Sequence, residues 1–194
     1  MSARDEILAA VRDAVATARR PVDVPPLQRP ERSGDVDLFA ERVADYRATV
    51  VRCGPEGVEE AVAAALPAGG PVVVPDGLPY AVPRALRDED LSAGRLDEVA
   101  AVVTTATVGI ATTGTIVLSH GPGEGRRALT LVPDLHVCII RADQVVDDVP
   151  AAVRRLDPGR PTTWISGPSA TSDIELSRVE GVHGPRRLHV VVVA

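Results

Sequence analysis

The sequence predicts an α/β fold with a mostly parallel sheet, preceded by an N-terminal helical arm. The main observation is that several predicted strands, among them residues 72–74 and 136–141, are continuous apolar runs. Strands of this kind are buried on both faces, as in a parallel sheet covered by helices. Helical patterns alternate with these strands along the chain. The core is aliphatic, because 45% of the 194 residues are apolar and only 2% are aromatic.

The chain begins with an amphipathic pattern that predicts a helix over residues 3–20. A proline-rich segment without an apolar period follows at 21–34 and predicts a linker. We therefore expect two parts, a helical arm with its linker at 1–34 and an α/β domain at 35–194. The apolar face of the predicted helix consists of Ile7, Leu8, Val11, Val15 and Ala18.

The domain is expected to start with a helix capped by Asp37, whose apolar stripe is Phe39, Val43 and Tyr46. From residue 48 onwards, strand patterns and helix patterns alternate. The predicted strands are 48–52, 72–74, 101–107, 115–119, 136–141, 162–166 and 188–193, and the predicted helices are 55–66, 79–87 and 148–156.

An uncharged stretch at residues 99–123 is long enough to span a bilayer. Its threonine and glycine residues dilute the apolarity that insertion needs, so buried β-structure explains it better. The N-terminus carries charges every few residues and has no apolar signal region. Cys53 and Cys138 do not imply a disulfide framework. We therefore expect a cytoplasmic protein.

Composition excludes several classes of function. The net charge is −6 and aromatic residues are few, which argues against nucleic-acid binding. All 21 basic residues are arginine, and this excludes Walker-type phosphate loops and lysine Schiff bases, since both need an amine. Two cysteines cannot ligate an iron–sulfur cluster or a zinc ribbon, so we expect no metal and no cofactor in this chain. His136 and His189 lie in apolar strands and are expected to be core histidines with satisfied hydrogen bonds.

A turn rich in glycine and threonine, Gly109-Ile-Ala-Thr-Thr-Gly-Thr115, joins two predicted strands. The hydroxyls of Thr113 and Thr115, together with the backbone N–H groups around Gly114, predict a cradle for an anion. The alternative is a tight turn or a bulge in a threonine-rich sheet.

A second motif, His120-Gly-Pro-Gly-Glu-Gly-Arg-Arg127, is a glycine-rich loop that ends in two arginines. Arg126 and Arg127 are candidates to clamp a carboxylate or a phosphate, because guanidinium groups bind both in a bidentate manner. The alternative is a solvated connection whose arginines are surface charges.

A third motif, Ser166-Gly-Pro-Ser-Ala-Thr-Ser-Asp-Ile-Glu175, follows a predicted strand. Ser169 and Thr171 are expected to face a crevice at the strand end, near a helix N-terminus that suits anions. The capping pattern that begins at Ser172 explains the same segment as the start of a helix after Asp173. Both interpretations can hold together.

The fourth motif, Gly181-Val-His-Gly-Pro-Arg-Arg-Leu-His189, precedes the last predicted strand. His183 is a candidate proton carrier near neutral pH, and the alternative is a hydrogen-bonded structural histidine. Ser169, Asp173 and His183 do not predict a hydrolytic triad, because the nucleophile elbow G-x-S-x-G is absent.

The four motifs in this order resemble the LUD-domain family, in its lactate-utilisation protein C (LutC-like) branch. The match covers the C-terminal half densely, whereas the N-terminal half matches only in layout. The matching residues are Gly109-Ile110-Ala111-x-Thr113-Gly114-Thr115, Arg126-Arg127-x-Leu129-x-Leu131-x-Pro133-x-x-His136, Gly167-Pro168-Ser169-x-Thr171-x-Asp173-Ile174-Glu175 and Gly181-x-His183-Gly184-Pro185-Arg186-x-Leu188-His189-Val190.

The resemblance implies a three-layer α/β fold like that of the NagB/RpiA/CoA-transferase superfamily. It also implies a role in oxidising L-lactate to pyruvate, together with LutA-like and LutB-like proteins that carry the iron–sulfur clusters. Many relatives carry Glu where this chain has Thr112. Since a carboxylate is the acyl acceptor of CoA-transferases, that chemistry is not expected here.

Two alternatives to a subunit of a lactate-oxidation system stay open. One is a stand-alone enzyme that acts on a phosphorylated or CoA-linked small molecule, by analogy with the superfamily. The other is a non-catalytic interaction module that docks through the helix at 3–20. The sequence leaves open whether the chain catalyses any step. For the lactate system we predict an anion site made of Thr113, Gly114, Thr115, Arg126, Arg127, Ser169 and Thr171, with Asp173 and His183 as catalytic residues.

Overall fold

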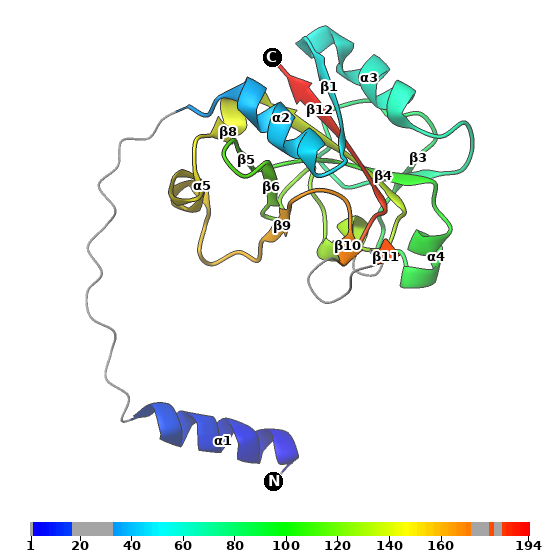
Figure 1. The fold of residues 1–194 in the computed structure, drawn as a ribbon. Helices are drawn as coiled ribbons and strands as arrows, with labels where there is room; N and C mark the ends of the chain where they lie inside the picture. The colour runs from blue at the N-terminus through cyan, green and yellow to red at the C-terminus, as the bar shows by residue number, and fades with distance from the viewer. Residues whose placement is uncertain (1, 17–32, 172–178, 181–183) are drawn as a thin grey trace. The chain divides into compact units, whose positions relative to one another are not determined.

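The chain divides into two compact units, residues 1–30 and 31–194. The computed structural model describes residues 2–16, 33–171, 179–180 and 184–194. The first unit contains helix α1 (Ala3–Ala16), so the predicted helix is confirmed up to residue 16 (Figure 1). Residues 17–20 and nearly all of the predicted linker lie outside the described residues. Three apolar side chains of α1 are more than half exposed, namely Ile7, Val11 and Val15.

The second unit is built on a six-stranded sheet in which every pair of neighbouring strands is parallel. The strand order is β1-β12-β7-β4-β2-β3, so the last strand of the chain lies between the first strand and a middle one (Figure 1). The prediction of an α/β fold with a mostly parallel sheet is confirmed. The strands are β1 (Thr49–Cys53), β2 (Val72–Val74), β3 (Ala85–Arg87), β4 (Ala101–Thr105), β7 (Leu135–Arg141) and β12 (Arg187–Val193).

A smaller mixed sheet has the strand order β8-β5-β6-β9. The uncharged stretch 99–123 supplies β4, β5 and β6, which confirms its interpretation as buried β-structure. In the described part of the chain, no helix combines the length and the apolar character needed to cross a membrane. The strands are β5 (Val108–Ile110), β6 (Thr115–Leu118), β8 (Val145–Val146) and β9 (Thr163–Ile165), and a separate hairpin pairs β10 (Ala170–Thr171) with β11 (Val179–Glu180).

Helices cover both faces of the parallel sheet. The apolar side chains of α3 pack on one face, while α2 and the mixed sheet pack on the other. The outer face of the mixed sheet is covered by α5 (Figure 1). The helices are α2 (Val36–Asp45), α3 (Val58–Ala65), α4 (Ala93–Asp97) and α5 (Val149–Arg155), with short 3₁₀ turns η1 (Pro55–Gly57), η2 (Arg127–Thr130) and η3 (Ala142–Gln144).

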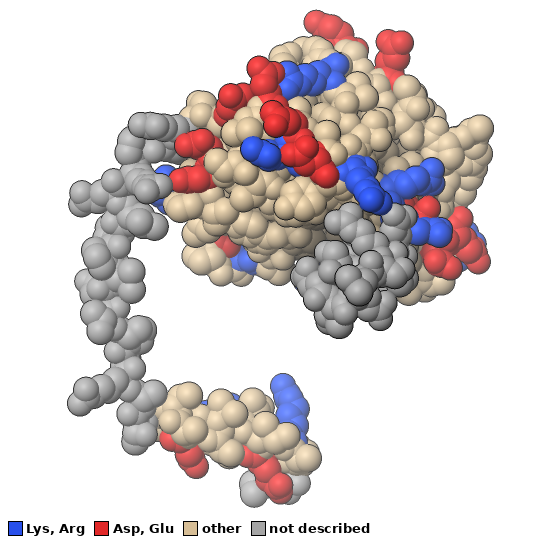
Figure 2. Space-filling view, viewed as in Figure 1, with Lys and Arg blue, Asp and Glu red and all other residues tan. Residues whose placement is uncertain are grey.

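Helix α2 begins two residues earlier than predicted. Its cap is Asp35 instead of Asp37, because the Asp35 carboxylate accepts hydrogen bonds from the backbone N–H groups of Asp37 and Leu38. Phe39 and Val43 are fully buried, as the apolar stripe predicts, whereas Tyr46, at the C-terminal cap, is 50% exposed. The opposite side of α2 is exposed and rich in acidic side chains, which Figure 2 shows as a red band over this helix.

The helix predicted at residues 79–87 is wrong. This segment is an irregular loop that leads into the edge strand β3. Pro83 has no backbone N–H for a helical hydrogen bond, and Arg84 adopts a positive φ of 56°, which no right-handed helix contains. The short elements α4, β5 and β8 were not predicted, since none is long enough to show a clear apolar period.

Candidate functional site

A cavity of about 310 Å³ lies where β9 ends and where β7 and β12 begin. This volume falls within the range of small-molecule sites. Its walls come from η2, from the ends of three strands and from the segment after β9. We call it the first cavity. It is lined by Arg127, Thr130, Leu131, His136, Thr163, Trp164, Ile165, Ser166, Gly167, Pro168, Ser169, Gly184, Pro185 and Leu188.

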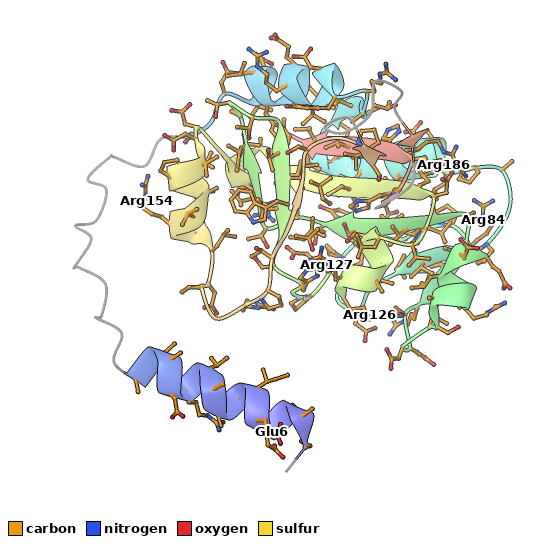
Figure 3. The ribbon with its side chains drawn as sticks, turned by 60° about the horizontal axis from the view of Figure 1, so that its bottom comes forward. Glu6, Arg84, Arg126, Arg127, Arg154 and Arg186 are labelled. Atoms are coloured by element: carbon orange, nitrogen blue, oxygen red, sulfur yellow. The ribbon has the colours of Figure 1, made fainter. Side chains whose placement is uncertain are left out.

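Arg127 is the cation of the first cavity. It is the first residue of η2, and its side chain is exposed. Its guanidinium forms no hydrogen bond and no ion pair with any described residue. Figure 3 shows Arg127 on the side of η2 that faces β9, whereas Arg126 lies toward α4. Among the described residues, the positive charge of Arg127 at the first cavity is therefore not paired.

His136 forms part of the cavity wall from the parallel sheet. The side chain is only 1% exposed, and its Nε2 lies 2.8 Å from Thr104 Oγ1 on the neighbouring strand β4. Burial lowers the pKa of His136 to about 4, because the interior disfavours the charged imidazolium. The ring is therefore neutral at pH 7. Its prediction as a buried, hydrogen-bonded histidine is confirmed.

A second cavity of about 570 Å³ lies where β2 and β3 end. Arg126 lines it, but this guanidinium is already committed. It forms a bidentate ion pair with Asp88 at 2.7 and 2.9 Å and also donates to the Leu91 carbonyl. The hydrogen bonds from Arg126 hold the pKa of the Asp88 carboxyl below its usual value. Arg126 thus fastens η2 to the segment that leads into α4.

The glycine-rich loop between these two cavities is held by His120 and Glu124. His120 Nδ1 donates to the Gly125 carbonyl at 2.8 Å, and its Nε2 lies 2.8 Å from Thr163 Oγ1, which lines the first cavity. Glu124 is buried and accepts hydrogen bonds of 2.6 Å from Thr107 Oγ1 and from the Ser119 backbone N–H. Sequence reasoning missed Glu124. In the sequence, Glu124 is a single acidic residue between two glycines, a pattern that is typical of ordinary polar loops and does not indicate burial.

The predicted threonine cradle lies behind the wall of the first cavity. Thr113 Oγ1 lies 2.7 Å from Thr115 Oγ1, which lies 2.8 Å from Ser166 Oγ, a cavity residue. Gly114 faces helix α2, because a Cβ at its φ of 60° would come within 2.6 Å of the Arg42 carbonyl carbon. None of the three residues Thr113–Thr115 lines either cavity.

The structure thus brings Arg127 and Ser169 together at the first cavity, with Ser166 linking the cavity to Thr115. Arg126 belongs to the second cavity. Thr171 lies in β10, of which the backbone alone is described. Asp173 and His183, as well as the helix predicted after Asp173, lie outside the described residues.

His189 differs from its prediction as a satisfied core histidine. Its Nε2 is buried and has no hydrogen-bond partner in the described part of the chain. Burial lowers the pKa of this histidine, which keeps the ring neutral and reduces the cost of the missing hydrogen bond. Within the described ranges, no group of three or more His, Cys, Asp or Glu side chains is arranged to hold a metal ion.

The fold and the first cavity define an α/β protein with a ligand-sized cavity that is lined by an arginine without a partner among the described residues. The sequence matches the LUD domain family over residues 91–193. This range includes η2, β7, β9 and β12, which together form the walls of the first cavity. The chain belongs to the LUD-domain family.

Relatives of known sequence and structure agree with this assignment. The chain is 44% identical to Lactate utilization protein C of Deinococcus radiodurans, an alignment that covers 98% of this chain and 95% of that protein. It is 31% identical to Lactate utilization protein C of a Geobacillus species over 64% of this chain and 63% of that protein. The crystal structure of a DUF162 family protein from Deinococcus radiodurans superposes with a TM-score of 0.70 at 40% identity, covering 82% of this chain and 96% of that one.

Proposed function

We propose that this chain is a subunit or accessory protein of an L-lactate oxidation system and that its first cavity binds a small carboxylate. The observation that carries the proposal is the guanidinium of Arg127, which lines a ligand-sized cavity and has no partner in the part of the chain that the structure describes. The identity of 44% over nearly the whole length of Lactate utilization protein C supports lactate metabolism as the setting.

The chemistry of the cavity favours a small carboxylate. Guanidinium binds carboxylate through two parallel hydrogen bonds, and this chain has no lysine that could take the same role. Ser166 and Ser169 bring hydroxyl groups to the same cavity. A carboxylate with a few carbon atoms fits the volume and leaves room for water. We propose Thr171 as a further ligand-binding residue, and Asp173 and His183 as the groups that move protons.

Electron transfer is proposed to take place on partner proteins of the LutA-like and LutB-like kind, which hold the iron–sulfur clusters. The chain itself has only two cysteines, one buried and one half-buried. Its own contribution is then to bind and orient the carboxylate in the cytoplasm and to assemble with the partners.

Purification tests the place of the chain in such a system. The tagged chain is isolated without oxygen from its own cells grown on lactate, and the co-purifying proteins, the iron content and lactate-dependent dye reduction are measured. We expect iron–sulfur proteins and activity in the eluate. A chain that elutes alone, without iron and without activity, would contradict the subunit assignment and favour a stand-alone enzyme or an interaction module.

Complementation tests the site. A strain that lacks the gene receives the wild-type chain, Arg127→Ala or Arg154→Ala, and growth on lactate is recorded. Arg154 is the matched control, since it is an exposed arginine on α5 that lines neither cavity (Figure 3). We expect Arg127→Ala to grow at least tenfold more slowly, or not at all, and Arg154→Ala to grow normally. Normal growth of both strains would refute the site.

A further inference from the structure

We infer that Nδ1 of His136 accepts a hydrogen bond from a hydroxyl group of the ligand, so that the first cavity selects 2-hydroxycarboxylates. This inference rests on the proposed carboxylate site and adds a second point of recognition to it. It assigns a ligand contact to a side chain that sequence reasoning placed in the core.

Three linked polar contacts favour one of the two ring tautomers of His136. Cys138 Sγ lies 3.9 Å from the Thr105 carbonyl, which can only accept, so the thiol is the donor. Thr104 Oγ1 donates to Cys138 Sγ at 3.9 Å. With the single hydroxyl proton of Thr104 directed at Cys138, the Thr104 oxygen is left to accept from His136 Nε2, which lies 2.8 Å away. This pattern favours the tautomer of the neutral ring that has its proton on Nε2.

The Cys138 thiol keeps its proton and therefore remains a hydrogen-bond donor. Burial raises the pKa of Cys138 to about 12, so that the group stays a protonated donor at every physiological pH. His136 is neutral because burial lowers its pKa to about 4. A neutral imidazole has one N–H, and the second nitrogen, Nδ1, presents a lone pair.

The burial of His136 and the lining of the first cavity together indicate where this lone pair lies. Among the described residues, two buried side-chain atoms lack a hydrogen-bond partner, Ser119 Oγ and His189 Nε2. His136 Nδ1 also has no hydrogen-bond partner in the described part of the chain, but it is not one of these fully buried atoms. His136 lines the cavity, so the cavity is where the exposed 1% of its surface lies.

The cavity thus offers a cation at Arg127 and a neutral acceptor at His136. A 2-hydroxycarboxylate such as L-lactate matches both, since its carboxylate pairs with guanidinium and its hydroxyl donates to Nδ1. Propionate has no hydroxyl group. The 2-oxo oxygen of pyruvate is an acceptor and would be repelled by the lone pair of Nδ1. An unmatched polar group in a buried site costs more than a missing contact, so the discrimination is strongest against pyruvate.

Thr104 is the positioning residue in this arrangement, because it accepts from Nε2 and does not line the cavity. Thr104→Val keeps the shape of the side chain and removes the acceptor. Thr104→Ser keeps the hydroxyl and serves as the matched control. In the Thr104→Val variant, the His136 ring loses the acceptor that keeps its proton on Nε2, so that neither tautomer is favoured.

The test is calorimetric titration of the full-length chain with L-lactate, propionate and pyruvate. For the wild type and for Thr104→Ser we expect L-lactate to bind about tenfold more tightly than propionate, the worth of one good hydrogen bond. For Thr104→Val we expect that preference to fall to within about twofold while propionate binding is unchanged. Nitrogen-15 NMR of the histidines gives a second readout, in which His136 Nδ1 has the shift of an unprotonated ring nitrogen.

The outcomes separate this inference from the proposed function. Binding of L-lactate and propionate with equal affinity, or an NMR signal from a protonated His136 Nδ1, would overturn the role of His136 and leave the carboxylate site in place. Failure of all three acids to bind to the wild type would overturn the carboxylate site and, with it, the inference.

Discussion

The two cavities use neighbouring arginines in opposite ways. The Arg126 guanidinium donates two hydrogen bonds to the Asp88 carboxylate and one to the Leu91 carbonyl. Arg127, the next residue, has an exposed guanidinium with no partner among the described residues. The two residues are of the same type and adjacent in the sequence, so the difference comes from the groups that the fold places next to each side chain. A paired guanidinium stabilises the structure, whereas an unpaired guanidinium on a cavity is available to a ligand.

We expect the largest effect from His136, which lines the first cavity. Its burial should lower the free energy of unfolding in mild acid. The pKa of His136 is about 4 in the folded chain and 6.5 in a free histidine. The unfolded chain binds the proton more readily, so the full stabilisation is present above pH 6.5 and is lost as the pH falls to about 4. The expected loss in the free energy of unfolding is about 3 kcal/mol. Urea denaturation between pH 8 and pH 4 measures it.

Matched variants assign this pH dependence to the first cavity. His136→Gln should flatten the slope between pH 6.5 and 4, whatever its effect on stability at pH 7. His189 also has a pKa lowered by burial and contributes in the same direction, so His189→Gln should keep most of the slope. An unchanged slope in His136→Gln would show that this ring is not the buried neutral group described above.

The second cavity predicts the next effect, a loss of stability when its ion pair is broken. Arg126→Ala leaves the Asp88 side chain, which is 8% exposed, without its partner. We expect a loss of about 2 kcal/mol in the free energy of unfolding at pH 7. The double variant Asp88→Ala/Arg126→Ala should lose less, because no unpaired charge is left. A loss below about 0.5 kcal/mol in Arg126→Ala would place this pair among weak surface pairs.

Acid also separates this pair from His136. The pKa of Asp88 lies below its usual value of 3.8, so the stabilisation is present above about pH 4 and disappears as the pH falls further. The pH dependence of stability below pH 4 should therefore be weaker in Arg126→Ala than in the wild type. An identical dependence in both proteins would contradict the pairing.

Gly114 predicts a smaller effect, which tests whether the threonine turn serves packing. Gly114→Ala would bring a Cβ within 2.6 Å of the Arg42 backbone at a φ of 60°, so we expect a loss of about 1–2 kcal/mol. Gly121→Ala is the control, because its Cβ would meet only the Arg160 side chain at an ordinary 3.5 Å. Equal stability of the two variants by urea denaturation would refute the close packing of Gly114 on α2.

Arg127 predicts the smallest effect on stability and thereby sharpens the contrast with Arg126. Arg127→Ala should change the free energy of unfolding by less than about 0.5 kcal/mol, since no described residue loses a partner. The rise in melting temperature that a bound carboxylate causes in the wild type should be absent from this variant. A loss of stability as large as that of Arg126→Ala would show that Arg127 has a structural role.

The candidate site was predictable only in part. Arg127 and Ser169 were recognisable because each lies in a short motif of glycine and polar residues next to a strand. His136 was predicted as a core histidine, since nothing in an apolar strand reveals that one ring nitrogen reaches a cavity. Arg126 was indistinguishable from Arg127, because its partner Asp88 is 38 residues away.

By itself, the sequence determined the α/β class, most of the strands and the buried face of α2, because these depend on the local apolar period. Only the tertiary structure decided the strand order, in which β12 lies between β1 and β7. The register aligns Val73 with Val102 and Val102 with His136, so the short strand β2 ends at the level of the first residues of β7. The two adjacent arginines thereby line different cavities, Arg126 the second and Arg127 the first. Contacts between such distant segments depend on how the whole chain packs, which no local pattern encodes.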